Sequence, residues 1–130
     1  MLLNRAEAEN ELNGPTELAY NSINAVRARA GLDPLAGRTQ DQLREDIKME
    51  RAWELLGEGI HRKTDLLRWG ELEQALNTRL ALEEAHPKTH PNHVNNLKMT
   101  LQYYAPHKNV FPIPAEEILL NPKLTQNEGY

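Results

Sequence analysis

The strongest structural signal of the chain lies in residues 50–70, ERAWELLGEGIHRKTDLLRWG, where charges of both signs alternate with large apolar residues over about six helical turns. Glu50, Glu54 and Glu58 recur every four residues, so a helix would place all three on one face. Three like charges in a row destabilise an isolated helix by roughly a few tenths of a kcal/mol per pair. These carboxylates therefore need cationic partners, and the arginines of the same stretch are the nearest candidates.

The charged residues of this stretch support two interpretations, a structural ion-pair network or a binding site. Structural networks imitate sites in a sequence, and we expect the network. Its expected members are Glu50, Arg51, Glu54, Glu58, Arg62, Asp65 and Arg68. Removing one partner of a buried pair costs about 3–5 kcal/mol. Arg62→Ala is therefore expected to unfold the chain or make it insoluble, without a specific loss of ligand binding.

Gly57 and Gly59 divide the stretch and predict a kink or a close backbone contact, because glycine weakens a helix by about 1 kcal/mol relative to alanine. The helices expected around them cover residues 40–56, 60–69 and 71–85. The first of these begins with the capping-box pattern Thr39-x-x-Gln42.

The N-terminal part of the sequence predicts a helical hairpin. Apolar residues recur at helical spacing in residues 2–12 and 16–30. Gly14 suits a left-handed cap, and Pro15 suits the first position of the second helix. Residues 31–34, Gly-Leu-Asp-Pro, end that helix and resemble the end of a tetratricopeptide-type repeat. One such hairpin cannot bury its own apolar face, and the sequence contains no second copy.

After residue 85 the helical pattern fades. Residues 86–96, HPKTHPNHVNN, predict a loop, and residues 97–104 fit either an extended or a helical piece. The tail, residues 109–130, contains three prolines and has room for about two helical turns in AEEILLN. No strand alternation persists, so the predicted class is all-α, with tetratricopeptide-like hairpins, long irregular loops and an extended proline-rich tail. Three segments are expected: a hairpin over residues 1–35, central helices over 39–85, and loop and tail over 86–130.

The composition sets further limits. Only 39% of the 130 residues are apolar and the mean hydropathy is −0.70, so the chain forms a thin helical layer or packs against another surface. A net charge of −4 and a pI of about 5.7 argue against a nucleic-acid partner. The absence of cysteine excludes disulfides and thiolate ligands. The sequence has no apolar run of about 18 residues and no visible signal peptide.

Three histidines follow the spacing H-x3-H-x2-H, at His86, His90 and His93. They could bind zinc or nickel if a helical turn formed there. Pro87 and Pro91 argue against a regular helix, so we expect an exposed histidine-rich loop and no metal site.

An enzyme-class alternative rests on two Glu-x-x-His pairs, Glu58 with His61 and Glu83 with His86. Di-metal carboxylate bundles use two such pairs and two further glutamates on facing helices. Gly59 lies inside the first pair, and no apolar heptads support a four-helix bundle. The sequence also lacks a nucleophile triad and a phosphate-binding glycine loop, so we expect neither catalysis nor a cofactor.

The tail carries the most specific pattern. Residues 109–130, NVFPIPAEEILLNPKLTQNEGY, strongly resemble the closing segment of the SusD/RagB family. That segment typically runs as an aliphatic or aromatic residue, Pro-Ile-Pro, a short helix with Glu, and then Asn-Pro-x-Leu-x-Gln-Asn-Pro-Gly-Tyr. The matching residues are Phe111, Pro112, Ile113, Pro114, Glu117, Ile118, Asn121, Pro122, Leu124, Gln126, Asn127, Gly129 and Tyr130. Glu128 replaces the usual proline.

Two earlier segments agree with this resemblance. Residues 50–70 are similar to the family pattern Glu-Arg-x-x-Glu-Leu, Glu-Gly, Arg and Asp-Leu-x-Arg-Trp-Gly, with one more residue than expected between Gly59 and Asp65. Residues 19–35, AYNSINAVRARAGLDPL, resemble the segment where Asn-x-Val-Arg-x-Arg-Ala-Gly is usual. The resemblance covers nearly the whole chain and is weakest over residues 82–104.

The resemblance implies a non-catalytic protein of the bacterial outer membrane, facing the medium. SusD/RagB members are lipoproteins of Bacteroidetes that capture glycans and deliver them to a TonB-dependent transporter. They are several times longer than this chain, so the chain is expected to be a C-terminal portion or a truncated member that acts mainly as a scaffold. The alternative from another class is a free-standing helical protein–protein interaction module.

Glycan binding requires exposed aromatic side chains, and the chain has few aromatic residues. Trp53 and Trp69, within residues 50–70, are expected in the core. Tyr103 and Tyr104 are the candidate ligand-binding residues, because they lie in a segment without a clear helical pattern.

Overall fold

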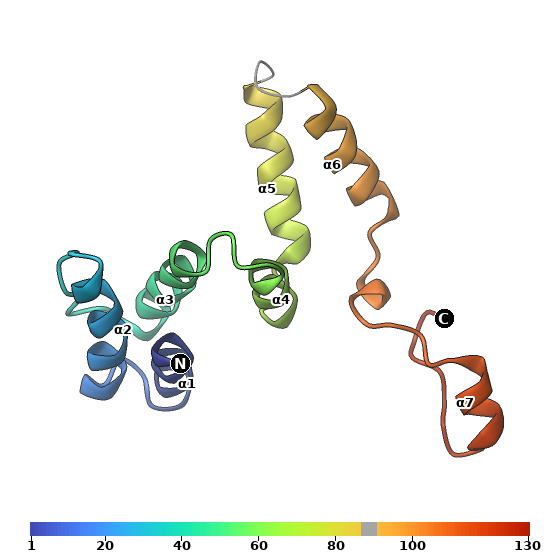
Figure 1. The fold of residues 1–130 in the computed structure, drawn as a ribbon, viewed down its shortest axis with the longest axis horizontal. Helices are drawn as coiled ribbons and strands as arrows, with labels where there is room; N and C mark the ends of the chain where they lie inside the picture. Colours follow the sequence, from blue (N-terminus) through green and yellow to red (C-terminus); the bar gives the residue numbers. More distant parts are fainter. Residues whose placement is uncertain (87–90) are drawn as a thin grey trace. The chain divides into compact units, whose positions relative to one another are not determined.

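The computed structural model describes residues 1–86 and 91–130, and these residues form helices and connecting segments without a strand (Figure 1). The elements are α1 (Leu2–Asn13), α2 (Glu17–Arg29), α3 (Gln40–Glu54), α4 (His61–Arg68), α5 (Leu72–Ala85), α6 (Pro91–Tyr103), a 3-10 helix η1 (Pro106–Asn109) and α7 (Ala115–Leu120). The predicted all-α class is confirmed. The chain divides into two compact units, unit 1 (Met1–Arg62) and unit 2 (Lys63–Tyr130). The three segments expected from the sequence stay a prediction.

Unit 1 is built around three helices, with α1 packed against both α2 and α3 (Figure 1). Each helix contributes apolar side chains to one buried cluster. The cluster consists of Leu3, Ala6, Ala19, Ile23, Val26, Leu43 and Ile47. Fully burying one such large aliphatic side chain contributes about 1.5–3 kcal/mol. The predicted hairpin therefore buries its apolar face against a third helix, α3.

Polar side chains cap the N-termini of α2 and α3. The Gln42 amide N–H donates to Thr39 Oγ1 over 3.2 Å, and the Thr39 N–H donates to Gln42 Oε1 over 3.0 Å, which confirms the capping box. Gly14 follows α1 with a φ of 81° and a ψ of −165°. The positive φ favours glycine, but this ψ is not that of the left-handed cap expected from the sequence. Pro15 does not open α2, because Thr16 is the N-cap and accepts from the N–H of Ala19.

The chain leaves α3 after Glu54, slightly earlier than the predicted end at residue 56. Gly57 and Gly59 then adopt φ values of 83° and 65°, a region that favours glycine. A Cβ added at either position would meet no atom of a more distant residue within 4 Å. The turn therefore requires the backbone conformation of these glycines and not a close approach.

Trp53 does not lie in the core, contrary to the expectation. Its side chain is 67% exposed, because it projects from the face of α3 that does not carry Leu43 and Ile47. Trp69 is half-buried, and the guanidinium carbon of Arg68 lies 4.7 Å from its ring centroid.

In unit 2, α5 and α6 pack against each other (Figure 1). The loop prediction for residues 86–96 is wrong from Pro91 onward, where α6 begins, and its residues 87–90 lie outside the described part of the chain. Pro91 stands at the first helical position, where the missing N–H costs no hydrogen bond. A proline that was expected to break a helix therefore starts one.

The tail of unit 2 follows α6 through η1 to the short helix α7. Burial is sparse in this unit. Among its described residues, those classed as buried are Asp65, Leu66 and Glu83. Across the described chain, no helix combines the length and the apolar character that crossing a bilayer requires.

Candidate functional site

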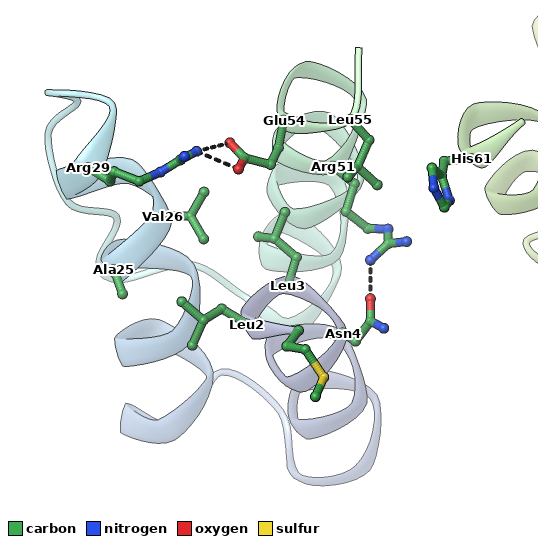
Figure 2. Close-up of a pocket in the computed structure, with 11 residues that line it drawn as sticks. Leu2, Leu3, Asn4, Ala25, Val26, Arg29, Arg51, Glu54, Leu55 and His61 are labelled. Atoms are coloured by element: carbon green, nitrogen blue, oxygen red, sulfur yellow. Dashed lines mark hydrogen bonds and ion pairs between the residues drawn. The ribbon is translucent and has the colours of Figure 1, made fainter. Parts of the chain in front are cut away.

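A hollow of about 570 Å³ in unit 1 lies beside the ends of α1, α2 and α3 (Figure 2). Leu3 and Val26 provide apolar walls, and Asn4, Arg51 and His61 bring polar groups to it. This volume falls within the range of small-molecule pockets, about 300–1,000 Å³. The hollow is therefore the candidate site that geometry alone suggests.

Four of the polar side chains around this hollow, Asn4, Arg29, Arg51 and Glu54, contact one another in pairs. Arg29 Nη2 of α2 donates to both carboxylate oxygens of Glu54 of α3, and Arg51 donates to Asn4 Oδ1 of α1 (Figure 2). The Nε of Arg51 also lies 4.0 Å from the Glu7 carboxylate. Each of these contacts joins two helices, so the charged residues here hold the bundle together.

A second cross-helix contact lies deeper in unit 1. Arg27 Nη1 donates to Glu50 Oε2 over 2.9 Å, and Arg27 Nε donates to the carbonyl of Asp33 over 2.8 Å. The Glu50 side chain is 8% exposed, and removing its cationic partner would leave a buried carboxylate uncompensated. Arg27, which lies on α2, thereby holds both α3 and the segment that follows α2.

Asn24 fixes the same segment through a reciprocal pair of hydrogen bonds with the backbone of Leu35. The Leu35 N–H donates to Asn24 Oδ1 over 2.8 Å, and Asn24 Nδ2 donates to the Leu35 carbonyl over 3.0 Å. Asn24, Arg27 and Arg29 are the polar residues of the segment 24–29, NAVRAR. All three act on backbone or on carboxylates of α3.

The remaining members of the expected network lie in different settings. Asp65 is buried and accepts from Arg68 Nε over 2.9 Å within α4. Glu58 is exposed in the turn after α3, outside any helix, so it does not continue the row of Glu50 and Glu54. Arg62 is exposed at the end of unit 1. The structural role of the whole set stays a prediction.

The di-metal alternative lacks the geometry that it needs. Glu58 is not helical, so it does not stand one helical turn before His61. Glu83 is buried on α5 and pairs with Arg79. Within residues 1–86 and 91–130, no group of three or more acidic or histidine side chains could hold a metal ion.

The structure describes two of the three histidines of the H-x3-H-x2-H pattern. His93 lies on α6, with Nδ1 3.9 Å from Glu83 Oε1 on α5, and His86 follows α5. His90 falls outside the described residues.

The two candidate ligand-binding tyrosines stand at the end of α6. Tyr103 is its last residue and is 62% exposed, whereas Tyr104 is half-buried and its hydroxyl accepts from Asn109 Nδ2 over 3.3 Å. The Tyr103 carbonyl accepts from Lys108 Nζ over 2.8 Å. Of the two, Tyr103 presents more surface to a ligand.

The end of the tail binds its own beginning. Gln126 accepts from the Ile113 N–H over 2.8 Å and donates to the Ile113 carbonyl over 2.9 Å. Asn127 Nδ2 donates to the Phe111 carbonyl over 2.7 Å, and the Tyr130 hydroxyl donates to the Val110 carbonyl over 2.9 Å. The Gln-Asn-x-Gly-Tyr ending thus closes residues 110–130 into a loop around α7.

Gly129 completes this closed loop. Its φ is 91°, and a Cβ built there would lie 2.6 Å from His107 Cγ. The His107 ring meets the Tyr130 ring edge to face, with centroids 5.0 Å apart. The spacing of the ending is therefore explained by closure of the loop.

An exposed ion pair links α1 and α3 away from the hollow. Arg44 donates to the two carboxylate oxygens of Glu11 over 2.6 and 2.8 Å. These hydrogen bonds hold the pKa of Glu11 below its ordinary value and raise the pKa of Arg44. The periodicity of the sequence could not predict this ion pair, because Glu11 and Arg44 are 33 residues apart in the chain.

Comparison with known proteins places this arrangement in one family. A family model described as the SusD family matches residues 1–130. The SusD-like protein P25 of Formosa agariphila is 35% identical over 139 residues, which cover 96% of this chain and 22% of that protein. A SusD homologue of Bacteroides thetaiotaomicron, solved as a crystal structure, is 32% identical with a TM-score of 0.78 and covers 99% of this chain.

The same comparisons define the extent of the match. The chain spans 25% of the length of the crystallised homologue and 22% of P25. The family model covers both the bundle of unit 1 and the tail of unit 2. The chain belongs to the SusD family.

Proposed function

We propose that this chain is the scaffold part of a non-catalytic nutrient-binding system at the cell surface, which captures oligosaccharide at the outer membrane and delivers it to a TonB-dependent transporter. The observation that carries the proposal is the family match along all 130 residues. The contacts of unit 1 support a scaffold role. Arg27, Arg29 and Arg51 each join two helices, which leaves them engaged in structure.

A non-catalytic role agrees with the chemistry of the hollow. A general base or nucleophile must reach the substrate with a free reactive atom. Both carboxylate oxygens of Glu54 instead accept from Arg29 Nη2. The carboxylate of the hollow is thus used to join α2 and α3.

For the oligosaccharide itself, Tyr103 is the side chain that we propose as a contact. Its ring is largely exposed, and Lys108 binds its backbone carbonyl, which fixes the end of α6. A sugar ring can stack on an exposed aromatic face. Replacing the aromatic side chain by alanine removes that contact. Tyr104 is the weaker candidate, because it is less exposed than Tyr103 and Asn109 binds its hydroxyl.

The test begins with fractionated native cells and an antibody against residues 109–130. A cell-surface, outer-membrane band supports the proposal, and a soluble band at 14.9 kDa favours a free-standing interaction module. The second step is a polysaccharide pull-down with the native protein and its Tyr103→Ala variant. Binding that survives in Tyr104→Phe and falls in Tyr103→Ala supports the ligand contact. Equal binding by all three proteins removes Tyr103 from the proposal and leaves the family role intact.

A further inference from the structure

The end of α1 carries the one Asn-Gly step of the sequence, Asn13-Gly14. Asn13 is the last residue of the helix, and its side chain is exposed. The backbone nitrogen of the next residue can attack the side-chain carbonyl of an asparagine. That attack is easiest when the next residue is glycine, because no Cβ shields the nitrogen. This step is therefore the place where the chain is most open to deamidation.

The reaction needs only water and a base. The Gly14 nitrogen loses its proton to solvent and attacks Cγ of Asn13. A bond forms between this nitrogen and Cγ, the bond from Cγ to Nδ2 breaks, and the side-chain nitrogen leaves as ammonia. The product is a succinimide ring, which water opens at either of its carbonyls to give aspartate or isoaspartate. Both final products carry a carboxylate where the amide stood, which changes the local charge.

The fold holds both reacting groups. The Gly14 N–H donates to the Asn10 carbonyl over 2.9 Å and closes the last turn of α1. The Asn13 Nδ2 donates to Glu9 Oε1 over 3.1 Å. Attack therefore requires this turn to open, and helix ends open at a lower free energy than the core. Fraying of the end of α1 thus sets the rate of the reaction.

The product cannot restore the contact that the amide makes. Glu9 Oε1 also accepts from Thr16 Oγ1 over 2.8 Å, and Thr16 is the N-cap of α2. A carboxylate at position 13 stands four residues after Glu9, where a like charge destabilises a helix and an amide donor stabilises it. Negative charge at the C-terminal end of a helix is unfavourable as well. Both effects act on the turn that joins α1 to α2.

We propose that Asn13 is a site of spontaneous deamidation, and that the modification loosens the turn between α1 and α2. Opening of the turn permits the reaction, and the new carboxylate then favours the open turn. The consequence falls on unit 1, because α1 packs against both α2 and α3 there. The inference requires neither a glycan nor a transporter, so it stands or falls apart from the proposed function.

Peptide mass spectrometry of the purified chain, incubated at neutral pH with and without urea, tests the site and its dependence on opening. Aspartate and isoaspartate are expected together at position 13, formed severalfold more slowly in native buffer than in urea. Asn21 is the internal control, because it is exposed and precedes a serine but lies inside α2. It should stay intact in native buffer while Asn13 is converted. An unchanged Asn13, aspartate without isoaspartate, equal rates with and without urea, or equally fast conversion of Asn21 overturns the inference.

Two variants test the effect of the modification on the turn. Asn13→Asp reproduces the new charge and should lower the Tm by about 3–5 °C. Asn13→Gln is the matched control, because its amide can still donate to Glu9 but is too long to form the same ring with Gly14. It should melt as the unmodified chain does and resist conversion. Circular dichroism on heating measures both variants. Equal melting of Asn13→Asp and Asn13→Gln would show that the carboxylate leaves the turn intact and would refute the loosening.

Discussion

Units 1 and 2 have nearly equal lengths but are stabilised in different ways. The buried apolar cluster lies wholly in unit 1, where three helices share it. Among the described residues of unit 2, Leu66 is the apolar side chain classed as buried, while Phe111 and Leu119 are 91% and 82% exposed. Unit 1 therefore gains stability from packing, whereas unit 2 depends on local hydrogen bonds, helix pairing and the closed tail. We expect unit 2 to open at a lower free energy than unit 1.

The sharpest test of this comparison is a matched pair of leucine truncations. Leu43 is fully buried in unit 1, so Leu43→Ala should lower the free energy of unfolding by about 4 kcal/mol. Leu119→Ala in unit 2 should change it by less than about 0.5 kcal/mol, because little of that side chain is buried. Urea denaturation followed by circular dichroism measures both. Equal losses would mean that the two units share one core.

Two arginine variants test whether an ion pair stabilises the fold only where it is buried. Arg27→Ala leaves the Glu50 carboxylate buried without its cation and should cost about 3 kcal/mol. Arg29→Ala removes a pair whose arginine is 68% exposed and should cost less than about 1 kcal/mol. Both arginines lie on α2 and contact α3, so their comparison tests burial, although Arg27→Ala also removes the hydrogen bond to the Asp33 carbonyl. An Arg29→Ala loss as large as that of Arg27→Ala would contradict the distinction.

The closed tail of unit 2 can be opened without touching unit 1. Gly129→Ala forces a Cβ against His107 at a φ of 91° and should cost about 2 kcal/mol. Hydrogen exchange of the Ile113 amide, which donates to Gln126, should become faster by more than an order of magnitude. Gly37→Ala is the control, because φ is also positive there but no atom crowds the new Cβ. An unchanged Ile113 exchange rate in Gly129→Ala would show that the tail does not close as described.

The smallest expected effect concerns pH and an exposed pair of unit 1. The folded-state pKa of Glu11 is depressed by Arg44, so this pair stabilises the fold above the unfolded pKa of about 4.3, and the stabilisation is lost as the pH falls through the folded value. Solvent limits the effect to about 0.2–1 kcal/mol, since both side chains are partly exposed. The unfolding free energies of the native chain and of Glu11→Gln should differ at pH 7 and converge near pH 3. A difference that grows in acid would have the wrong sign.

The sequence predicted local structure well where short-range chemistry determines it. The Thr39–Gln42 pattern located the start of α3, because both hydrogen bonds of a capping box form within one helical turn. Pro91 misled the prediction of α6, since proline breaks a helix in its interior but is favoured at its first position. The tail pattern identified the family, although it gave no indication that Gln126 binds the backbone of Ile113.

Contacts between helices could not be predicted from the sequence. The carboxylates of Glu50 and Glu54 were expected to find arginines nearby in their own stretch, but the structure pairs them with Arg27 and Arg29 on α2. Trp53 was expected in the core because it lies in the stretch of residues 50–70, whereas its position on α3 directs it outward. A single sequence gives the period of a helix, but it does not tell which of two apolar faces meets a neighbour.

The contact of Arg27 with Glu50 and Asp33 also has a consequence for how such sequences diverge. A lineage that loses Arg27 retains the buried Glu50 carboxylate without its cation, which destabilises the fold. A second substitution, at Glu50, then becomes advantageous. Substitutions at these two positions should therefore be inherited together, although 23 residues separate them. The Asp33 contact is to a backbone carbonyl and puts no such restraint on side-chain identity there. Across related genes, Arg27 and Glu50 should vary as one unit while Asp33 drifts independently.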